Sequence, residues 1–305
     1  MFNHGKIVPN ETVKIMKHKT ENNNSFELKD GRQLGFAEYG EPDGQPIFYF
    51  HGLPGSRLEA GHLHEVAVAN NFRLIGLDRP GMGLSSIEPK RSILSWVEDV
   101  EAFSDSMGID KFSIIGHSGG APFVAACAYV IPHRLKGAAI VSGMAPFENP
   151  EATASLSRGQ RIVNSIINAI PWIANVMMKL TYIMLNKPGM LKQMLKQMSE
   201  ADQFVFSDPE SSKAIIDATK EAFRNGVSGT SQEIVLSLKP WGFKLENISY
   251  PITIWQGGMD KQAPEMHARI YAKLIPNANL IFFKDEGHLS ILKNHGEEIL
   301  RRICL

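Results

Sequence analysis

The sequence predicts an α/β fold, in which a mostly parallel central sheet is flanked by helices and carries an inserted helical cap. Short apolar runs, such as residues 46–52 and 72–78, alternate with segments whose apolar residues recur at helical spacing. This alternation is typical of a parallel sheet covered by helices on both faces. From about residue 144 to 242 the strand pattern stops and helical patterns follow one another. The expected units are an N-terminal extension at 1–24, a core formed by 25–143 and 243–305, and a cap at 144–242.

The elements of the core follow in order along the chain. Residues 25–40 alternate in polarity and turn at Asp30 and Gly31, which predicts an antiparallel hairpin at the edge of the sheet. The polar stretch before it, 21–25, is expected to be a linker. Continuous apolar runs predict buried strands, and a 3.6-residue period predicts helices. Further strands are expected at 46–52, 72–78, 111–118, 135–143, 250–258 and 278–285, with helices at 58–70, 91–109, 119–130, 263–275 and 289–303.

Composition excludes some partners. The 305 residues include 32 Lys and Arg against 32 Asp and Glu, so the formal net charge is zero, which argues against a nucleic-acid partner. The two cysteines, Cys127 and Cys304, make neither a disulfide framework nor a metal site, which favours a reducing cytoplasmic location. We expect no metal and no cofactor, and the composition leaves the oligomeric state open.

One segment, 166–185, has the length of a membrane span. It contains Pro171, Asn168, Asn175 and Lys179, which are unfavourable in hydrocarbon. We therefore expect buried or lid helices here and no stable membrane insertion. The first twenty residues lack a continuous apolar stretch of signal-peptide length, and we expect them to form an extension.

A serine stands where a strand pattern meets a helix pattern. Gly116, His117, Ser118, Gly119 and Gly120 fit G-x-S-x-G, the sequence of a nucleophile elbow. The flanking glycines permit a tight turn that raises the serine hydroxyl above the end of the strand. The amide of Gly119, at the start of the helix, can donate to a developing oxyanion. The plainer alternative is a strand–helix turn with a capping serine.

Two further residues follow later strands on the same edge of the expected sheet. Asp260 comes after the strand at 250–258, and His288 comes after the strand at 278–285. A serine nucleophile needs a base, and the base needs a group that orients it. The chain order Ser118, Asp260, His288 is the order of this class of catalytic triad. The amide of Leu53, after the strand at 46–50, is the candidate second oxyanion donor.

Three other polar residues near these strand ends are expected to be structural. His51 is expected to hold its own loop by hydrogen bonds, and Asp78 to tie loops together through backbone amides. His117 is expected to be a packing or entrance residue pointing away from the serine.

Together these residues resemble the α/β-hydrolase fold superfamily. The matching segments, "HGLPGS", "DRPGMGLS", "GHSGG", "GGMDKQAP" and "EGHLS", cover roughly residues 26–143 and 243–303. The resemblance implies that Ser118 attacks an acyl carbonyl, His288 takes its proton and Asp260 holds the imidazolium. The amides of Leu53 and Gly119 would then stabilise the oxyanion.

Departures from related patterns narrow the expected activity. Proline-iminopeptidase-like members typically show H-G-G-P-G and a tryptophan after the nucleophile, where this chain has Leu53 and Gly119. Epoxide hydrolases and haloalkane dehalogenases of this fold carry an aspartate nucleophile. We therefore expect a carboxylic-ester hydrolase acting on a small-molecule substrate with a small to medium, apolar acyl or alcohol group. The methionine-rich cap suits an adaptable apolar pocket, or simply fills its own core. An amide hydrolase, a non-catalytic binding or signalling member of the fold, and a transferase or lyase remain the alternatives.

Overall fold

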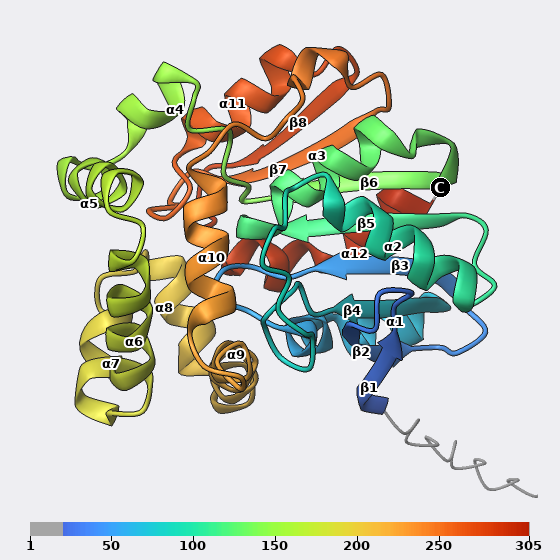
Figure 1. The fold of residues 1–305 in the computed structure, drawn as a ribbon, viewed down its shortest axis with the longest axis horizontal. Helices are drawn as coiled ribbons and strands as arrows, with labels where there is room; N and C mark the ends of the chain where they lie inside the picture. The colour runs from blue at the N-terminus through green and yellow to red at the C-terminus, as the bar shows by residue number, and fades with distance from the viewer. Residues whose placement is uncertain (1–20, 305) are drawn as a thin grey trace, which may run out of the picture.

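The structure, a computed structural model that describes residues 21–304, is built on one eight-stranded sheet (Figure 1). The strand order is β1-β2-β4-β3-β5-β6-β7-β8, in which the pairs β1–β2 and β2–β4 are antiparallel and the other neighbouring pairs are parallel. The expected fold class, including the antiparallel hairpin at one edge, is confirmed. The strands are β1 (Glu21–Glu27), β2 (Gln33–Gly40), β3 (Gln45–Phe50), β4 (Phe72–Leu77), β5 (Phe112–His117), β6 (Leu135–Val141), β7 (Ile252–Gly257) and β8 (Ala278–Phe283).

The first strand begins earlier than the sequence indicated. The polar stretch 21–25 is not a linker, because Asn24 and Ser25 pair in register with Phe36 and Gly35 of β2. Its polar side chains concealed the strand: an edge strand needs only backbone hydrogen bonds, and it can leave polar side chains facing water. The rest of the expected extension, residues 1–20, lies outside the described residues.

Helices cover both faces of the sheet, because alternate residues of each strand point to opposite sides. In β3, Phe48 and Phe50 belong to the core cluster under one set of helices, whereas Ile47 and Tyr49 belong to the cluster on the other face. The first set is α2 (Ser95–Ser106), α3 (Ala121–Val130) and α11 (Glu265–Leu274). The second is a 3₁₀ helix at Arg57–Leu63, α1 (His64–Ala69) and α12 (Ser290–Cys304).

The segment between β6 and β7, for which we keep the name cap, contains helices and, among its described residues, no strand. The parallel strands end toward these helices (Figure 1). The stretch 166–185 is not one helix but parts of two, separated around Pro171, and no helix in the described residues is long and apolar enough to span a bilayer. The helices are α4 (Pro150–Ser155), α5 (Arg158–Ala169), α6 (Ile173–Leu185), α7 (Pro188–Leu195), α8 (Glu200–Ser207), α9 (Pro209–Glu221) and α10 (Ser228–Ser237).

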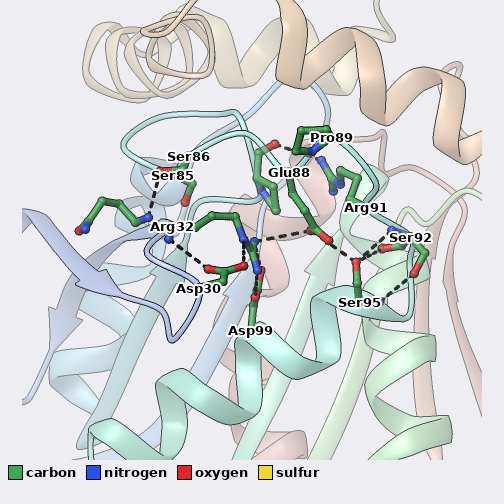
Figure 2. A network of polar contacts seen from close by, with 12 residues as sticks. Asp30, Arg32, Ser85, Ser86, Glu88, Pro89, Arg91, Ser92, Ser95 and Asp99 are labelled. Atoms are coloured by element: carbon green, nitrogen blue, oxygen red, sulfur yellow. Dashed lines mark hydrogen bonds and ion pairs between the residues drawn. The ribbon is translucent and has the colours of Figure 1, made fainter.

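The long loop between β4 and α2 is tied to the edge hairpin by charged side chains (Figure 2). Arg32, just after the hairpin turn, donates two hydrogen bonds to Asp99 of α2, at 2.9 and 2.7 Å. Its guanidinium also lies 3.5 Å from the carboxylate of Glu88 in the loop. The loop is thereby held against the sheet, and it carries Arg79 and Arg91 toward the cap.

A buried cluster of charges joins the cap to this loop. Glu233 of α10 accepts hydrogen bonds from Arg79 Nε at 2.8 Å and from Arg91 Nη2 at 2.8 Å. Burial alone would raise the pKa of Glu233, but the two guanidinium groups outweigh it and hold that pKa at about 2. Removing one partner from such a cluster leaves buried charge uncompensated, so the cluster holds α10 firmly to the core.

We predict that Glu233→Ala lowers the free energy of unfolding by about 3–5 kcal/mol, because it leaves two buried guanidinium groups without their carboxylate. Urea denaturation followed by circular dichroism measures the change. The matched control is Glu210→Ala, an exposed carboxylate of the same cap, which should leave stability nearly unchanged. Equal effects of the two substitutions would mean that the cluster does not anchor the cap.

Candidate active site

Ser118 sits at the tip of the turn between β5 and α3 in a left-handed backbone conformation, with φ of +51°. For a non-glycine residue this conformation costs roughly 1–2 kcal/mol. The turn leaves no room for side chains on either side. A Cβ on Gly120 would lie 2.2 Å from the carbonyl oxygen of Phe50, and one on Gly116 would lie 2.6 Å from Val124 Cγ2. The two glycines that the sequence singled out are therefore sterically required.

Asp260 and His288 lie on the loops after β7 and β8 and are hydrogen-bonded to each other. His288 Nδ1 lies 2.8 Å from Asp260 Oδ2. The other oxygen, Oδ1, accepts from the amides of Gln262 at 2.8 Å and Ala263 at 2.9 Å. Burial alone would raise the pKa of Asp260, but His288 and these amides outweigh it and lower that pKa. An ionised Asp260 holds the proton on Nδ1, so His288 Nε2 is the nitrogen free to act as a base.

Ser118 and His288 line one cavity of about 190 Å³. The structure thus brings the three residues to one edge of the sheet and forms the bond between Asp260 and His288. Among the described residues, the Ser118 hydroxyl makes no hydrogen bond, to His288 or to any other group. Hydrogen bonds at a catalytic site are often long or absent until substrate binds.

The two expected oxyanion donors lie side by side. The position of a Cβ on Gly119 would be 2.8 Å from Leu53 Cβ and 3.3 Å from Leu53 N. Gly119 belongs to the 3₁₀ turn Ser118–Gly120 that opens α3, where the first amides of a helix lack intrahelical acceptors. Leu53 N–H donates to no group in the described residues. Leu53 and Gly119 therefore lie next to each other, and both line the second cavity reached by Ser118.

His117 does not point away from the site, as the sequence suggested. Its Nδ1 lies 2.7 Å from Glu59 Oε1, and its Nε2 lies 3.1 Å from the carbonyl oxygen of His288. A carboxylate and a carbonyl can only accept, so both ring nitrogens donate and the ring is an imidazolium. Burial alone would lower the pKa of His117, but the charge and hydrogen bond of Glu59 outweigh it and raise that pKa.

Sequence analysis missed Glu59, which completes this arrangement. Besides pairing with His117, its carboxylate accepts from Tyr49 Oη at 2.8 Å and from the amide of Gly52 at 3.0 Å. Burial would raise the pKa of Glu59, yet His117 and the Gly52 amide hold it at about 2. One feature of the sequence could have pointed to Glu59. It is an acidic residue shortly after the "HGLPGS" loop, within a segment that was expected to pack as a helix on the sheet.

Asp202, in cap helix α8, was also missed, and it holds the loop that carries His288. It is 1% exposed. Its carboxylate accepts from three successive backbone amides: His288 at 3.0 Å, Leu289 at 2.7 Å and Ser290 at 3.1 Å. No local signal connects residues 86 apart in sequence. The main chain of His288 is therefore fixed on one side by the cap and, through its carbonyl, on the other side by His117.

The expected structural roles of His51 and Asp78 are confirmed. His51 Nδ1 lies 2.7 Å from the Gly52 carbonyl oxygen, and its Nε2 accepts from the Arg79 amide at 3.2 Å. Burial lowers the pKa of His51 to about 3, so the ring stays neutral. Asp78 accepts from the amides of Arg57 at 2.6 Å and Leu84 at 2.8 Å.

A second cavity, of about 280 Å³, also reaches Ser118. Its wall is mostly apolar and includes Phe123, Phe147 and Trp241. Ser118 and Leu53 line both cavities, so the hydroxyl stands where two apolar spaces meet. Among residues 21–304, no group of three His, Cys, Asp or Glu side chains is arranged to hold a metal ion.

Comparison with known proteins agrees with this architecture. A family model described as the alpha/beta hydrolase fold matches residues 45–162. A proline iminopeptidase of Neisseria gonorrhoeae is 30% identical over 118 residues, which is 37% of this chain and 37% of that protein. The chain thus aligns with little more than a third of that relative.

Solved structures resemble the chain over most of its length. An esterase from Exiguobacterium antarcticum superposes with a TM-score of 0.68 at 17% identity, covering 92% of this chain and 98% of the other. An enol-lactonase from Burkholderia xenovorans gives a TM-score of 0.66 at 16% identity, covering 92% and 99%. At such identities the likeness establishes a common fold.

The turn geometry yields a prediction about stability. Gly120→Ala should lower the free energy of unfolding by at least about 3 kcal/mol, because its Cβ would collide with a backbone carbonyl that cannot rotate away. Gly159→Ala is the control: it lies in α5 with nothing within 4 Å of a new Cβ, and it should raise stability by about 0.5–1 kcal/mol. Thermal unfolding of both variants measures the difference. If Gly120→Ala left the stability unchanged, the predicted collision with the Phe50 carbonyl would be wrong.

Proposed function

Because the chain belongs to the α/β-hydrolase superfamily, we propose that it is a serine hydrolase that cleaves a neutral carboxylic ester through an acyl-enzyme. The observation that carries the proposal is the strained conformation of Ser118, with φ of +51°, in a cavity also lined by His288, whose ring is hydrogen-bonded to Asp260. A serine that merely caps a helix accepts a hydrogen bond from an amide of the first turn. Ser118 makes no such bond in the described structure, so the strain supports a reactive role.

In the proposed reaction Ser118 Oγ attacks the ester carbonyl while His288 Nε2 takes its proton. The carbonyl oxygen gains negative charge and is bound by the amides of Leu53 and Gly119. The tetrahedral intermediate collapses, the C–O bond to the alcohol breaks, and the imidazolium of His288 donates its proton to the departing alcohol. Water then attacks the acyl-enzyme with the same histidine as base, which releases the acid and restores Ser118.

Three contacts would position the base. Asp260 fixes the tautomer of His288 through Nδ1, Asp202 holds its amide, and His117 holds its carbonyl. His117 is itself held as a cation by Glu59. The ring of His117 lies beside that of His288, with the two ring centroids 4.9 Å apart.

Charge in the cavities supports an ester over an aminoacyl substrate. An aminopeptidase must bind the free ammonium of its substrate, which calls for an unpaired carboxylate. The carboxylates that line the two cavities are Glu59 and Glu233, and both are already paired with buried cations. Two apolar spaces meeting at Ser118 suit an ester with a small to medium apolar group on each side of the scissile bond.

The first test is labelling of the nucleophile. We predict that a fluorophosphonate adds once to the wild type, at Ser118, as measured by intact mass and peptide mapping. Ser118→Ala should give no adduct while keeping its circular dichroism spectrum. His288→Ala and Asp260→Asn should slow labelling by at least about 100-fold, because the base is lost or held in the wrong tautomer. An adduct on another serine, or one retained in Ser118→Ala, would rule out the assignment.

The second test separates esters from aminoacyl substrates. We predict that p-nitrophenyl esters of short and medium acyl chains have kcat/KM values at least about 100-fold above those of aminoacyl p-nitroanilides, since an unpaired buried ammonium costs several kcal/mol. Ser118→Ala is the control for background hydrolysis. A preference for the prolyl anilide would favour a peptidase. Labelling without turnover would favour a binding or signalling protein, and diversion of the acyl group to an added alcohol would favour a transferase.

A further inference from the structure

The outer surface of the cap is unusually apolar. Eleven of the sixteen exposed large apolar side chains in the described residues fall between Ile162 and Phe204. On α6, Val176, Leu180 and Ile183 are spaced three or four residues apart and so share one side of the helix. With Ile162 and Ile166 of α5, which contacts α6, and Trp172 between the two helices, they form what we call the apolar cap face.

Packing within the protein does not account for this face. The opposite side of α6 already has a role, because Met178 and Leu185 are buried and Thr181 and Leu185 line the cavity of Ser118. The outward side leaves Trp172 65% exposed and Leu180 54% exposed. A group of exposed large apolar side chains on two neighbouring helices marks a site of contact with a protein or a membrane.

The charge around the face favours one kind of partner. Residues 152–199 contain no Asp or Glu and six cations: Arg158, Arg161, Lys179, Lys187, Lys192 and Lys196. All six are exposed, and none forms an ion pair within the part of the chain that the structure describes. The whole chain is neutral and all 32 acids lie elsewhere, so residues 152–199 carry six positive charges, whereas the rest of the chain has 26 Lys and Arg against 32 Asp and Glu.

We propose that the apolar cap face docks on an anionic lipid surface, with α5 and α6 lying in the plane of the interface. Amphipathic helices that carry basic residues beside exposed Trp, Leu and Ile bind membranes in this way without crossing them. A tryptophan at the edge of the face is the side chain that favours the boundary between headgroups and acyl chains. The side of α6 opposite the apolar cap face lines the cavity of Ser118. Docking would therefore place the wall of this cavity next to the lipid.

The main rival occupant is a second copy of this chain. A two-fold contact through the face would place the same surface patch of both copies together. The unpaired cations of one copy would then face those of the other, and their repulsion opposes such a dimer. An anionic bilayer instead supplies the complementary charge. Each basic residue near its surface raises the binding affinity about fivefold.

The test uses the full-length protein and vesicles of phosphatidylcholine with or without about 30% phosphatidylglycerol. Trp172 is the reporter, because the other three tryptophans, Trp96, Trp241 and Trp255, are buried. We expect co-flotation with the anionic vesicles and a blue shift of tryptophan emission, both weakened by salt. Trp172→Phe should keep flotation and lose the blue shift.

Paired variants separate the contribution of the positive charges to membrane binding from that of the apolar side chains. Lys187→Gln with Lys192→Gln should weaken binding about 25-fold, whereas Lys136→Gln with Lys284→Gln, exposed lysines outside the cap, should not. Val176→Ser with Leu180→Ser should abolish the blue shift, whereas Phe282→Ser, an exposed aromatic on β8, should not.

Absence of flotation, or equal binding to neutral vesicles, would overturn the proposal. So would a dimer in analytical ultracentrifugation that dissociates with Val176→Ser and Leu180→Ser. None of these results bears on the labelling of Ser118, which is measured in solution, so failure here is distinct from failure of the proposed hydrolase activity.

Discussion

The approach of Gly120 to the carbonyl of Phe50 is the contact on which the geometry of the site depends. It brings the first turn of α3 against the end of β3, and a Cβ at this position would lie 2.2 Å from that carbonyl oxygen. The same contact sets Gly119 beside Leu53, so two amides from different loops converge on one point. The tight turn also holds Ser118 in a left-handed backbone conformation, and Ser118 lines both cavities. Backbone packing, rather than side-chain hydrogen bonds, therefore aims the serine.

The histidine is positioned by different means. His288 lies on a loop, and loops need external contacts to hold a fixed geometry. Its amide is bound by Asp202 of the cap, its carbonyl by His117 of the turn and its ring by Asp260. His117 directly precedes Ser118, so the residue next to the serine also contacts the main chain of His288. The Glu59–His117 ion pair thus joins the loop at Gly52, the turn at Ser118 and the loop at His288 in one network of polar contacts.

The sequence predicted what depends on local pattern and missed what depends on distant contacts. The fold class, the glycines of the turn and the structural roles of His51 and Asp78 followed from apolar runs and turn chemistry. Strand β1 was missed at its start because an edge strand tolerates polar side chains on both sides. Glu59 and Asp202 could not be identified, since their partners lie 58 and 86 residues away. His117 was placed on the wrong side because strand alternation does not continue through a turn whose next residue has positive φ.

The cap divides into two halves that are held by different forces. Helices α8 to α10 are tied to the core by buried polar contacts: Asp202 to the His288 loop, Glu221 to Arg57, and Glu233 to Arg79 and Arg91. Between the described residues 156–195 and the core there is no hydrogen bond or ion pair, so α5 to α7 contact the core through apolar packing alone. Apolar packing is not directional. A helix held by apolar packing can therefore shift at a lower cost in free energy than a helix held by buried charges. The half that contacts the His288 loop is therefore the anchored half, whereas the half bearing the apolar cap face can shift without breaking the buried polar contacts of that loop.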